Sequence, residues 1–323
     1  MAIAGMAFLC LCCQKSTEGK YTGLVEKIIL GAVAIESSSL LYIADAKGMF
    51  KQHGLNVTLI DFPDGVKASD DLLKNRVDVA AVADFIFVTR SLQRNDLRIF
   101  GSIFSGDTFE IIARKDHGIT KPAHLRGRRI GLTKGTVLDF FMATFLSMQG
   151  ITAGSVRLVD LMPSEIPVAI SSGAVDAVIS WEPYAGQIRN NLGSKAVTWP
   201  GQSGQRYQFV LMAKEEFSKE RPIAVERLLK ALLEAAKYCA ENTEDVQNLL
   251  AARLGHDPAS LQSSWKRLDF RVSLDQDIVT LMEDEAKWLL KQKGEHRDIP
   301  NYLKYIEWRP LEKIKPDAIG LIH

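Results

Sequence analysis

The sequence predicts an α/β protein of two similar lobes, because one β-α-β pattern occurs twice along the chain. Residues 26–50 and 126–146 each run from an apolar strand through a short polar turn into an amphipathic helix. Residues 72–84 and 170–182 each contain the end of a helix, a Val-Asp pair and an apolar strand that closes on a carboxylate. Such an internal repeat indicates two lobes of the same design. Ligands bind beyond the carboxyl ends of parallel strands, so both turns should face one cleft.

Length and composition agree with two well-cored lobes. A chain of 323 residues is expected to form about two domains, and its 46% apolar and 24% charged residues are ordinary for a globular protein. The formal net charge of +1 gives no support for nucleic acid or an anionic membrane surface as a partner. Arg126, Arg128 and Arg129 form a local basic cluster, which we interpret as the solvated edge of a strand.

The first lobe is expected to contain residues 26–115 and 208–323, with residues 1–25 before it as a signal segment and linker. The spacing of its apolar residues predicts strands over residues 27–33, 55–62, 77–83 and 97–104, and helices over residues 40–47, 68–74 and 85–90. From residue 222 onward the pattern is almost entirely helical. We expect this tail to pack back on the first lobe.

The second lobe is expected to contain residues 116–207. Beyond the strand, turn and helix of residues 126–146, the pattern predicts a strand over 156–161, a helix over 164–172 and a strand over 175–180. The extended runs 108–115 and 208–213 are interpreted as two crossings between the lobes. Two crossings of this kind form a hinge.

The two polar turns are candidates for a binding site. They contain Ser37, Ser38 and Ser39 in the first lobe, and Thr133, Lys134, Gly135 and Thr136 in the second. The free N–H groups at the start of a helix can hold an anion or a carbonyl oxygen. The second turn is not a phosphate-binding loop, because its lysine precedes the second glycine and the spacing differs. Plain helix capping would explain the same hydroxyl groups, so both interpretations stay open.

The N-terminus contains an apolar stretch, residues 2–12, that is too short to span a bilayer and is followed by a polar segment. It resembles the hydrophobic region of an export signal. The cysteines near its end give it a resemblance to bacterial lipoproteins, in which a cysteine is lipidated and becomes the mature N-terminus. That resemblance implies Cys13 as the lipidated residue, with Cys12 as the alternative. Cys239, on an apolar helix, is interpreted as a small buried hydrophobe.

Three segments carry a family resemblance: GAVAIESSSLLYIADAKGMFKQHGLNVTLIDF, KPAHLRGRRIGLTKGT before a helix, and SGAVDAVISWEPY. They resemble solute-binding proteins of ABC importers, in the branch that includes nitrate, sulfonate, taurine and thiamine-precursor pyrimidine binders. The resemblance covers about residues 26 to 215. It implies a two-lobed periplasmic-binding-protein fold of type II, with each lobe a sheet flanked by helices and with a helical C-terminal tail.

The same resemblance implies a function. The protein would be an extracytoplasmic, membrane-anchored monomer without a cofactor, which closes on a small polar or anionic organic molecule and passes it to an ABC permease. Two alternatives stay open. Some enzymes of thiamine-pyrimidine and menaquinone biosynthesis resemble these binding proteins, and a sensory module would bind a ligand with the same fold.

The resemblance also implies ligand contacts. It places the residues of both turns, together with Asp84, Trp181 and Glu182 at strand ends, around the cleft. Lys134 would supply positive charge and the two carboxylates an acidic rim, so we expect a ligand with an acceptor-rich end and a donor-bearing end, such as an aminopyrimidine or an amino sulfonate. Structural roles remain open for the three strand-end residues and for Lys134.

Other chemistry finds no support in the sequence. The six histidines are scattered without the spacing of a zinc site. No Gly-x-Ser-x-Gly elbow occurs, and the serines of the first turn have no sequence sign of a paired base. We therefore expect no catalytic residues and no metal.

Overall fold

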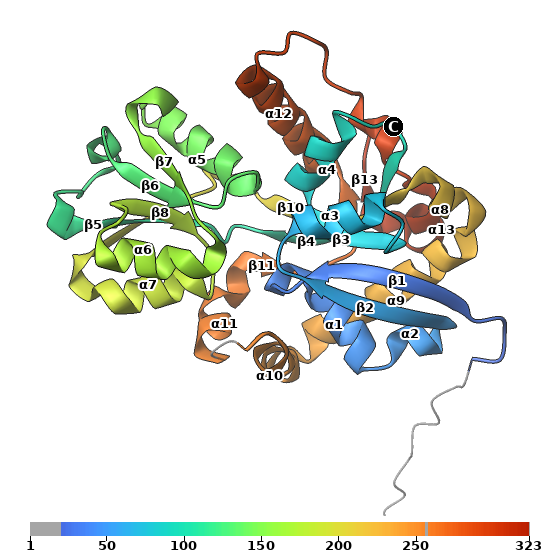
Figure 1. Ribbon diagram of the computed structural model, residues 1–323. Coiled ribbons are helices and arrows are strands. Elements are labelled where there is room, and N and C mark those ends of the chain that lie inside the picture. Colours follow the sequence, from blue (N-terminus) through green and yellow to red (C-terminus); the bar gives the residue numbers. More distant parts are fainter. Residues whose placement is uncertain (1–20, 256–257, 323) are drawn as a thin grey trace, which may run out of the picture.

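The computed structural model describes residues 21–255 and 258–322 and shows two α/β lobes (Figure 1). Cys12 and Cys13 lie outside the described residues. The first lobe contains a six-stranded sheet in the order β11-β4-β10-β3-β1-β2, and the second a five-stranded sheet in the order β7-β6-β8-β5-β9. Among the described residues, no helix combines the length and the apolar character needed to cross a membrane. The two-lobed architecture that the repeat predicted is confirmed.

The first sheet takes its strands from distant parts of the chain. They are β1 (Glu26–Val33), β2 (Leu55–Phe62), β3 (Val79–Ala83), β4 (Leu97–Gly106), β10 (Tyr207–Lys214) and the short β11 (Leu268–Asp269). Strands β1, β2 and β3 are parallel, whereas β10 runs antiparallel to both β3 and β4. Residues of β3 and β10 are buried nearly throughout, which is typical of central strands.

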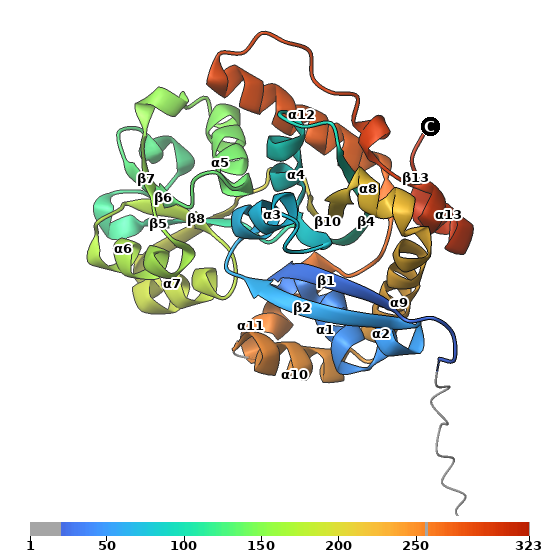
Figure 2. The ribbon, with the colours of Figure 1, turned by 45° about the vertical axis from the view of Figure 1, so that its right-hand side comes forward.

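Helices cover both faces of this sheet. Those of its first half are α1 (Ser39–Ala46), α2 (Met49–Gln52), α3 (Gly65–Leu73) and α4 (Asp84–Ser91). Those of the tail are α8 (Glu215–Glu220), α9 (Pro222–Glu241), α10 (Thr243–Leu254), α11 (Pro258–Ser264), α12 (Gln276–Lys293) and α13 (Arg309–Ile314), with a small β12 (Leu274–Asp275) and β13 (Ile319–Gly320) pair. α9 packs against α1 and α2 on one face, and α12 packs against α4 on the other (Figure 2). The tail therefore completes the core of the first lobe.

The second lobe repeats this design on a smaller scale. Its strands are β5 (Glu110–Arg114), β6 (Arg129–Leu132), β7 (Arg157–Asp160), β8 (Ala177–Ser180) and β9 (Ala196–Pro200), and its helices are α5 (Val137–Met148), α6 (Ile166–Ser172) and α7 (Tyr184–Leu192). Adjacent residues face opposite sides of the sheet: Ile112 and Val178 pack with α6 and α7, whereas Ile111 and Ile179 belong to the core shared with α5. Both faces are thus buried.

The repeated Val-Asp pair has one structural role in both lobes. The carboxylate of Asp78 accepts the N–H of Ile29 in β1 at 2.7 Å, and that of Asp176 accepts the N–H of Arg129 in β6 at 2.9 Å. In each lobe the aspartate N–H also donates back to the carbonyl of the same strand residue at 2.8 Å. Each aspartate therefore ties the start of β3 or β8 to its neighbouring parallel strand.

The expected boundary between the lobes is wrong at one point. Residues 108–115, predicted as a crossing within the first lobe, contain β5, which pairs with β8 and β9 and therefore belongs to the second sheet. The chain crosses over residues 107–109 and 201–206. An extended pattern predicts a strand but does not say which sheet the strand joins.

The two crossings are held together by Gln202, whose side chain is fully buried. Its Oε1 accepts the N–H groups of Thr108 at 2.6 Å and Phe109 at 2.9 Å. Its Nε2 donates to the carbonyls of Gly106 at 2.8 Å and Gln205 at 3.0 Å. One amide group thus satisfies backbone groups of both segments and links them to each other.

Candidate functional site

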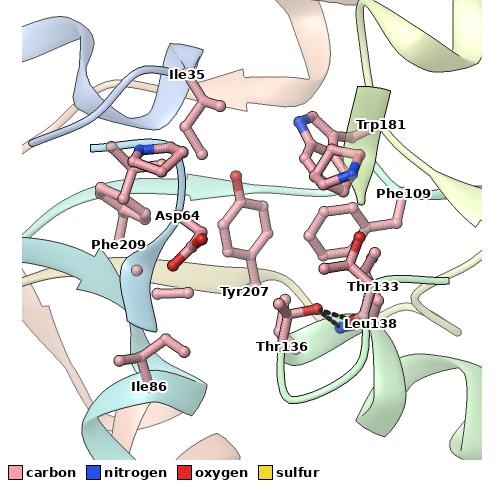
Figure 3. A pocket seen from close by; sticks show the side chains of 16 residues that line it. Ile35, Asp64, Ile86, Phe109, Thr133, Thr136, Leu138, Trp181, Tyr207 and Phe209 are labelled. Carbon is pink, nitrogen blue, oxygen red and sulfur yellow. Dashed lines mark hydrogen bonds between the residues drawn. The ribbon is translucent and has the colours of Figure 1, made fainter. Parts of the chain in front are cut away.

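A cleft of about 680 Å³, including its open mouth, lies between the lobes. Its walls are mostly apolar, and they come from both lobes and from the crossings (Figure 3). The first lobe contributes Val33, Ile35, Pro63, Asp64, Gly65, Ala83, Ile86 and Phe209, and the second contributes Thr133, Thr136, Val137, Leu138, Pro163 and Trp181. Phe109, in the first crossing, and Tyr207, where β10 begins directly after the second crossing, complete the lining. Both lobes thus face one cleft, but of the two polar turns only that of the second lobe contributes residues to its lining.

Three aromatic rings form one wall of the cleft at the hinge. The rings of Phe109 and Tyr207 stack with centroids 4.8 Å apart, and Trp181 meets Phe109 edge-on at 6.4 Å. The Tyr207 hydroxyl contacts that of Ser37, and burial raises the pKa of Tyr207 well above its usual range. The buried Trp181 Nε1–H has no hydrogen-bond partner among the described residues. The wall therefore presents mainly apolar ring faces to the cleft.

The second-lobe turn reaches the cleft through its two threonines. The Thr133 hydroxyl donates to the carbonyl of Leu161 at 2.9 Å, and the Thr136 hydroxyl donates to the carbonyl of Thr133 at 2.7 Å. Thr136 also accepts the N–H of Leu138 at 3.3 Å and so caps α5. Both hydroxyls already have partners in the protein, but only Thr136 acts as a helix cap, since Thr133 is bonded to the segment that follows β7.

The remaining residues of that turn point away from the cleft. Lys134 and Gly135 are exposed and do not line it. The N–H of Lys134 donates to Asp160 at 3.0 Å, and that of Gly135 donates to Asp139 at 2.5 Å. Burial raises the pKa of Asp139. The predicted anion seat is therefore largely filled by the protein's own oxygens, and no lysine stands at its floor.

The three serines of the first turn are buried and mainly shape the backbone. The hydroxyl of Ser38 donates to the carbonyl of Val33 at 2.7 Å, and that of Ser39 donates to the carbonyl of Glu36. Ser37 borders a small polar pocket behind Tyr207, in the 3₁₀ turn Glu36–Ser38. The structure therefore brings Ser37 near the cleft, while the hydroxyls of Ser38 and Ser39 are bonded to backbone carbonyls that precede α1.

Asp84 lies away from the cleft, contrary to the prediction that it lines the rim. It is fully buried at the start of α4, where its carboxylate accepts the N–H groups of Phe85 at 2.9 Å and of Gln208 at 3.0 Å. Burial raises the pKa of Asp84 to about 7, although these two hydrogen bonds oppose the shift. Asp84 therefore holds β10 to α4 rather than facing a ligand.

Glu182 is also buried, and its charge is balanced. Its carboxylate accepts from Arg189 at 2.5 Å and from the N–H of Gly186 at 2.9 Å. Arg189 bonds Glu110 as well, which in turn pairs with Arg267 of the first lobe at 3.2 Å. Glu182 borders the small pocket behind Tyr207, not the main cleft. The predicted acidic rim of Asp84 and Glu182 is absent from the cleft lining.

A different carboxylate, Asp64, faces the cleft. It caps α3: one oxygen accepts the N–H of Lys67 at 2.8 Å. Figure 3 shows this carboxylate turned toward the space surrounded by Tyr207, Thr136 and Ile86. Within the described part of the chain, Asp64 has no ion pair with a lysine or arginine. The segment Pro63-Asp64-Gly65 predicts only a turn, although the place of Asp64 just after the carboxyl end of β2 was a usable signal for a site residue.

The described residues give no sign of a metal centre, because they contain no group of three or more His, Cys, Asp or Glu side chains that could hold an ion. The cleft lining contains no histidine, cysteine or lysine. Asp64, Tyr207, Trp181 and the two threonines therefore supply all of its polar side-chain atoms.

Comparisons with known proteins agree with this geometry. The model of a family described as NMT1/THI5 like matches residues 36–246. A Bacillus subtilis protein named for binding aliphatic sulfonates is 25% identical over 267 residues, which is 80% of each chain. The structure of the periplasmic aliphatic sulphonate binding protein SsuA from Escherichia coli superposes with a TM-score of 0.76 at 16% identity, covering 87% of this chain and 97% of that one. A 2'-hydroxybiphenyl-2-sulfinate desulfinase of Rhodococcus erythropolis is 27% identical over 145 residues, 43% of this chain and 40% of that one.

Proposed function

Because the chain belongs to the NMT1/THI5-like family, whose model matches residues 36–246, we propose that it is the extracytoplasmic solute-binding subunit of an ABC importer. The observation that carries the proposal is the cleft lined by both lobes and by the crossings themselves. A solute in this cleft touches both lobes at once. Closure around it adds contacts that the open form lacks, so binding shifts the protein toward the closed form.

The hinge geometry fits this role. Phe109 and Tyr207 stand at the two crossings, stack on one another and line the cleft. Gln202 joins the crossing segments behind them. A bound solute therefore contacts the residues about which the lobes move. A permease can then distinguish the loaded from the empty protein by the relative position of the lobes.

The first test is ligand-dependent closure. Thermal unfolding of the protein is measured with sulfonates, nitrate, amino sulfonates, pyrimidines, and small aromatic acids and amines. At 100 times its dissociation constant, a true ligand stabilises by about 2.7 kcal/mol. Small-angle X-ray scattering with that compound should show a smaller radius of gyration, because the lobes approach. A bound compound that leaves the radius unchanged would contradict the proposal, and Trp181→Ala serves as a variant with a damaged cleft wall.

We place the anchor of the protein at Cys13, which follows the apolar segment at residues 2–12. A diacyl or triacyl cysteine holds a protein stably at a membrane, whereas one chain binds only marginally. In cells that process lipoproteins, Cys13→Ser should move the protein from the membrane to the soluble fraction, as judged by fractionation. Cys12→Ser is the matched control and should stay with the membrane. Unchanged partitioning of both single variants and of the double variant would exclude lipidation at this site.

The similarity to a desulfinase favours one alternative, an enzyme on the same fold. Catalysis would need a nucleophile or a base in the cleft. The lining offers Asp64, Tyr207, Thr133 and Thr136, and each except Asp64 has its oxygen engaged in a hydrogen bond within the protein. The described cysteine, Cys239, is buried in α9 and does not line the cleft. Binding therefore has the stronger geometric support.

A further inference from the structure

Resting on the proposed function, we infer that the solute is an organic ammonium ion: a protonated amine on a compact apolar body, held between Asp64 and the aromatic wall of the cleft. Three independent observations point to this chemistry. The cleft wall carries an unbalanced carboxylate, its remaining surface is mostly apolar, and the N–H groups of the second-lobe turn are already bonded within the protein.

The apolar body is required by the walls. Most lining residues are aliphatic or aromatic, among them Val33, Ile35, Ile86, Leu138 and Phe209. A small, strongly hydrated ion would lose its water on closure and gain few polar contacts in exchange. A solute with an apolar body gains from the same closure, because its surface and that of the walls leave water together.

The positive charge is required by Asp64. One oxygen of this carboxylate accepts the N–H of Lys67, and the carboxylate group is turned toward the cleft. No lysine or arginine lines the cleft to balance it. On closure the free oxygen loses water and needs a donor from the solute. A protonated amine supplies both the donor and the opposite charge, and such charge-assisted hydrogen bonds are the strong ones.

The aromatic wall suits the same group. Phe109, Trp181 and Tyr207 stand together at the hinge and line the cleft that Asp64 faces. Their ring faces carry partial negative charge and attract cations that come within about 6 Å. A carboxylate together with aromatic faces is a common way to recognise an ammonium ion. The same faces repel an anion.

The second-lobe turn is a poor site for an anion. At the second-lobe turn the N–H groups of Lys134, Gly135 and Leu138 already donate to side-chain oxygens of the protein. Asp139 adds a further carboxylate there. An anion would have to displace these oxygens and would lie in one closed cleft with Asp64, where like charges repel strongly.

The test compares three probes of similar shape by isothermal titration calorimetry near pH 7: 2-phenylethylamine, 2-phenylethanol and 3-phenylpropanoate. We expect the amine to bind at least about tenfold more tightly than the alcohol, and the carboxylate to bind more weakly than both. Asp64→Asn should weaken the amine by about tenfold or more and leave the alcohol unchanged. Asparagine still caps a helix, so α3 should remain folded.

Asp71→Asn is the matched control, because Asp71 lies on the same helix, pairs with Arg76 at 3.2 Å and does not line the cleft. It removes the same charge and should leave all three affinities unchanged. Tighter binding of the carboxylate than of the amine, or an equal effect of Asp64→Asn and Asp71→Asn, would overturn the inference. If none of the three probes binds while another compound closes the lobes, the ammonium assignment fails and the proposed function stands. If no compound closes the lobes, the proposed function itself fails.

Discussion

Replacing Glu285 by glutamine should raise the free energy of unfolding at pH 8 by roughly 3 kcal/mol, since the buried acid must otherwise keep its proton or ionise without a partner. Glu285 lies on α12 and is fully buried. Neither of its carboxylate oxygens has a hydrogen-bond partner among the described residues. Burial raises its pKa well above the usual range, and the neighbouring Asp84 and Asp284 raise it further.

The same two buried acids, Glu285 and Asp84, predict how stability depends on pH. The unfolded chain releases both protons near pH 4, whereas the folded chain keeps them longer, to about pH 7 for Asp84. Between these values the folded state binds more protons than the unfolded state. The free energy of unfolding must therefore fall as pH rises from about 5 to about 8. Urea unfolding at pH 5, 6.5 and 8 measures this slope.

Glu285→Gln should remove a large part of that decline, because glutamine has no proton to lose. Glu283→Gln is the matched control, because Glu283 is on the same helix with a side chain that is 39% exposed. It should leave both the slope and the stability nearly unchanged. If wild-type stability increases from pH 5 to pH 8, or if Glu285→Gln declines as steeply as the wild type, then the buried acid does not titrate as proposed.

The internal repeat made the fold predictable because the repeated segments form equivalent strands and helices with the same structural roles in both lobes. The strand predicted over residues 55–62 is β2, and those over 27–33 and 97–104 differ from β1 and β4 by at most two residues at an end. The two Val-Asp pairs recur because each aspartate ties two parallel strands together. The sheet that β5 joins could not be predicted, because that depends on pairing with β8 and β9, which lie more than 60 residues further along the chain.

The site was less predictable because a residue's place in the sequence does not fix the direction of its side chain. Thr136 and Trp181 line the cleft, whereas the side chain of Asp84, placed at a strand end by the same reasoning, turns inward. Its partner is the N–H of Gln208, which is 124 residues away in the sequence. Asp64 was not predicted as a site residue, because Pro63-Asp64-Gly65 is a typical turn sequence and a turn accounts for the aspartate without any ligand.

Replacing Asp176 by alanine should destabilise the protein by about 3 kcal/mol, because one buried carboxylate satisfies several groups of the second lobe. Asp176 accepts from the backbone N–H of Arg129 at 2.9 Å, from its guanidinium at 2.9 and 3.1 Å, and from His117 at 2.8 Å. Alanine leaves the N–H of β6 and the arginine without their acceptor. Urea unfolding at pH 7 measures the loss.

The pH dependence gives this prediction a second, independent readout. Burial alone would raise the pKa of Asp176, but the hydrogen bonds from Arg129 and His117 outweigh it and hold the pKa below the usual range. The stabilisation by Asp176 is therefore fully present above about pH 4, where the unfolded chain ionises, and is lost as pH falls below it. The difference in free energy of unfolding between the wild type and Asp176→Ala should therefore become smaller in acid.

Asp78→Ala is the matched comparison in the first lobe: the carboxylate of Asp78 also accepts a strand N–H, but its side chain is 35% exposed. Asp78→Ala should therefore lower the free energy of unfolding clearly less than Asp176→Ala does. An equal loss in both variants, or a gap for Asp176→Ala that stays constant down to pH 3, would show that packing rather than the carboxylate supports the strand pair.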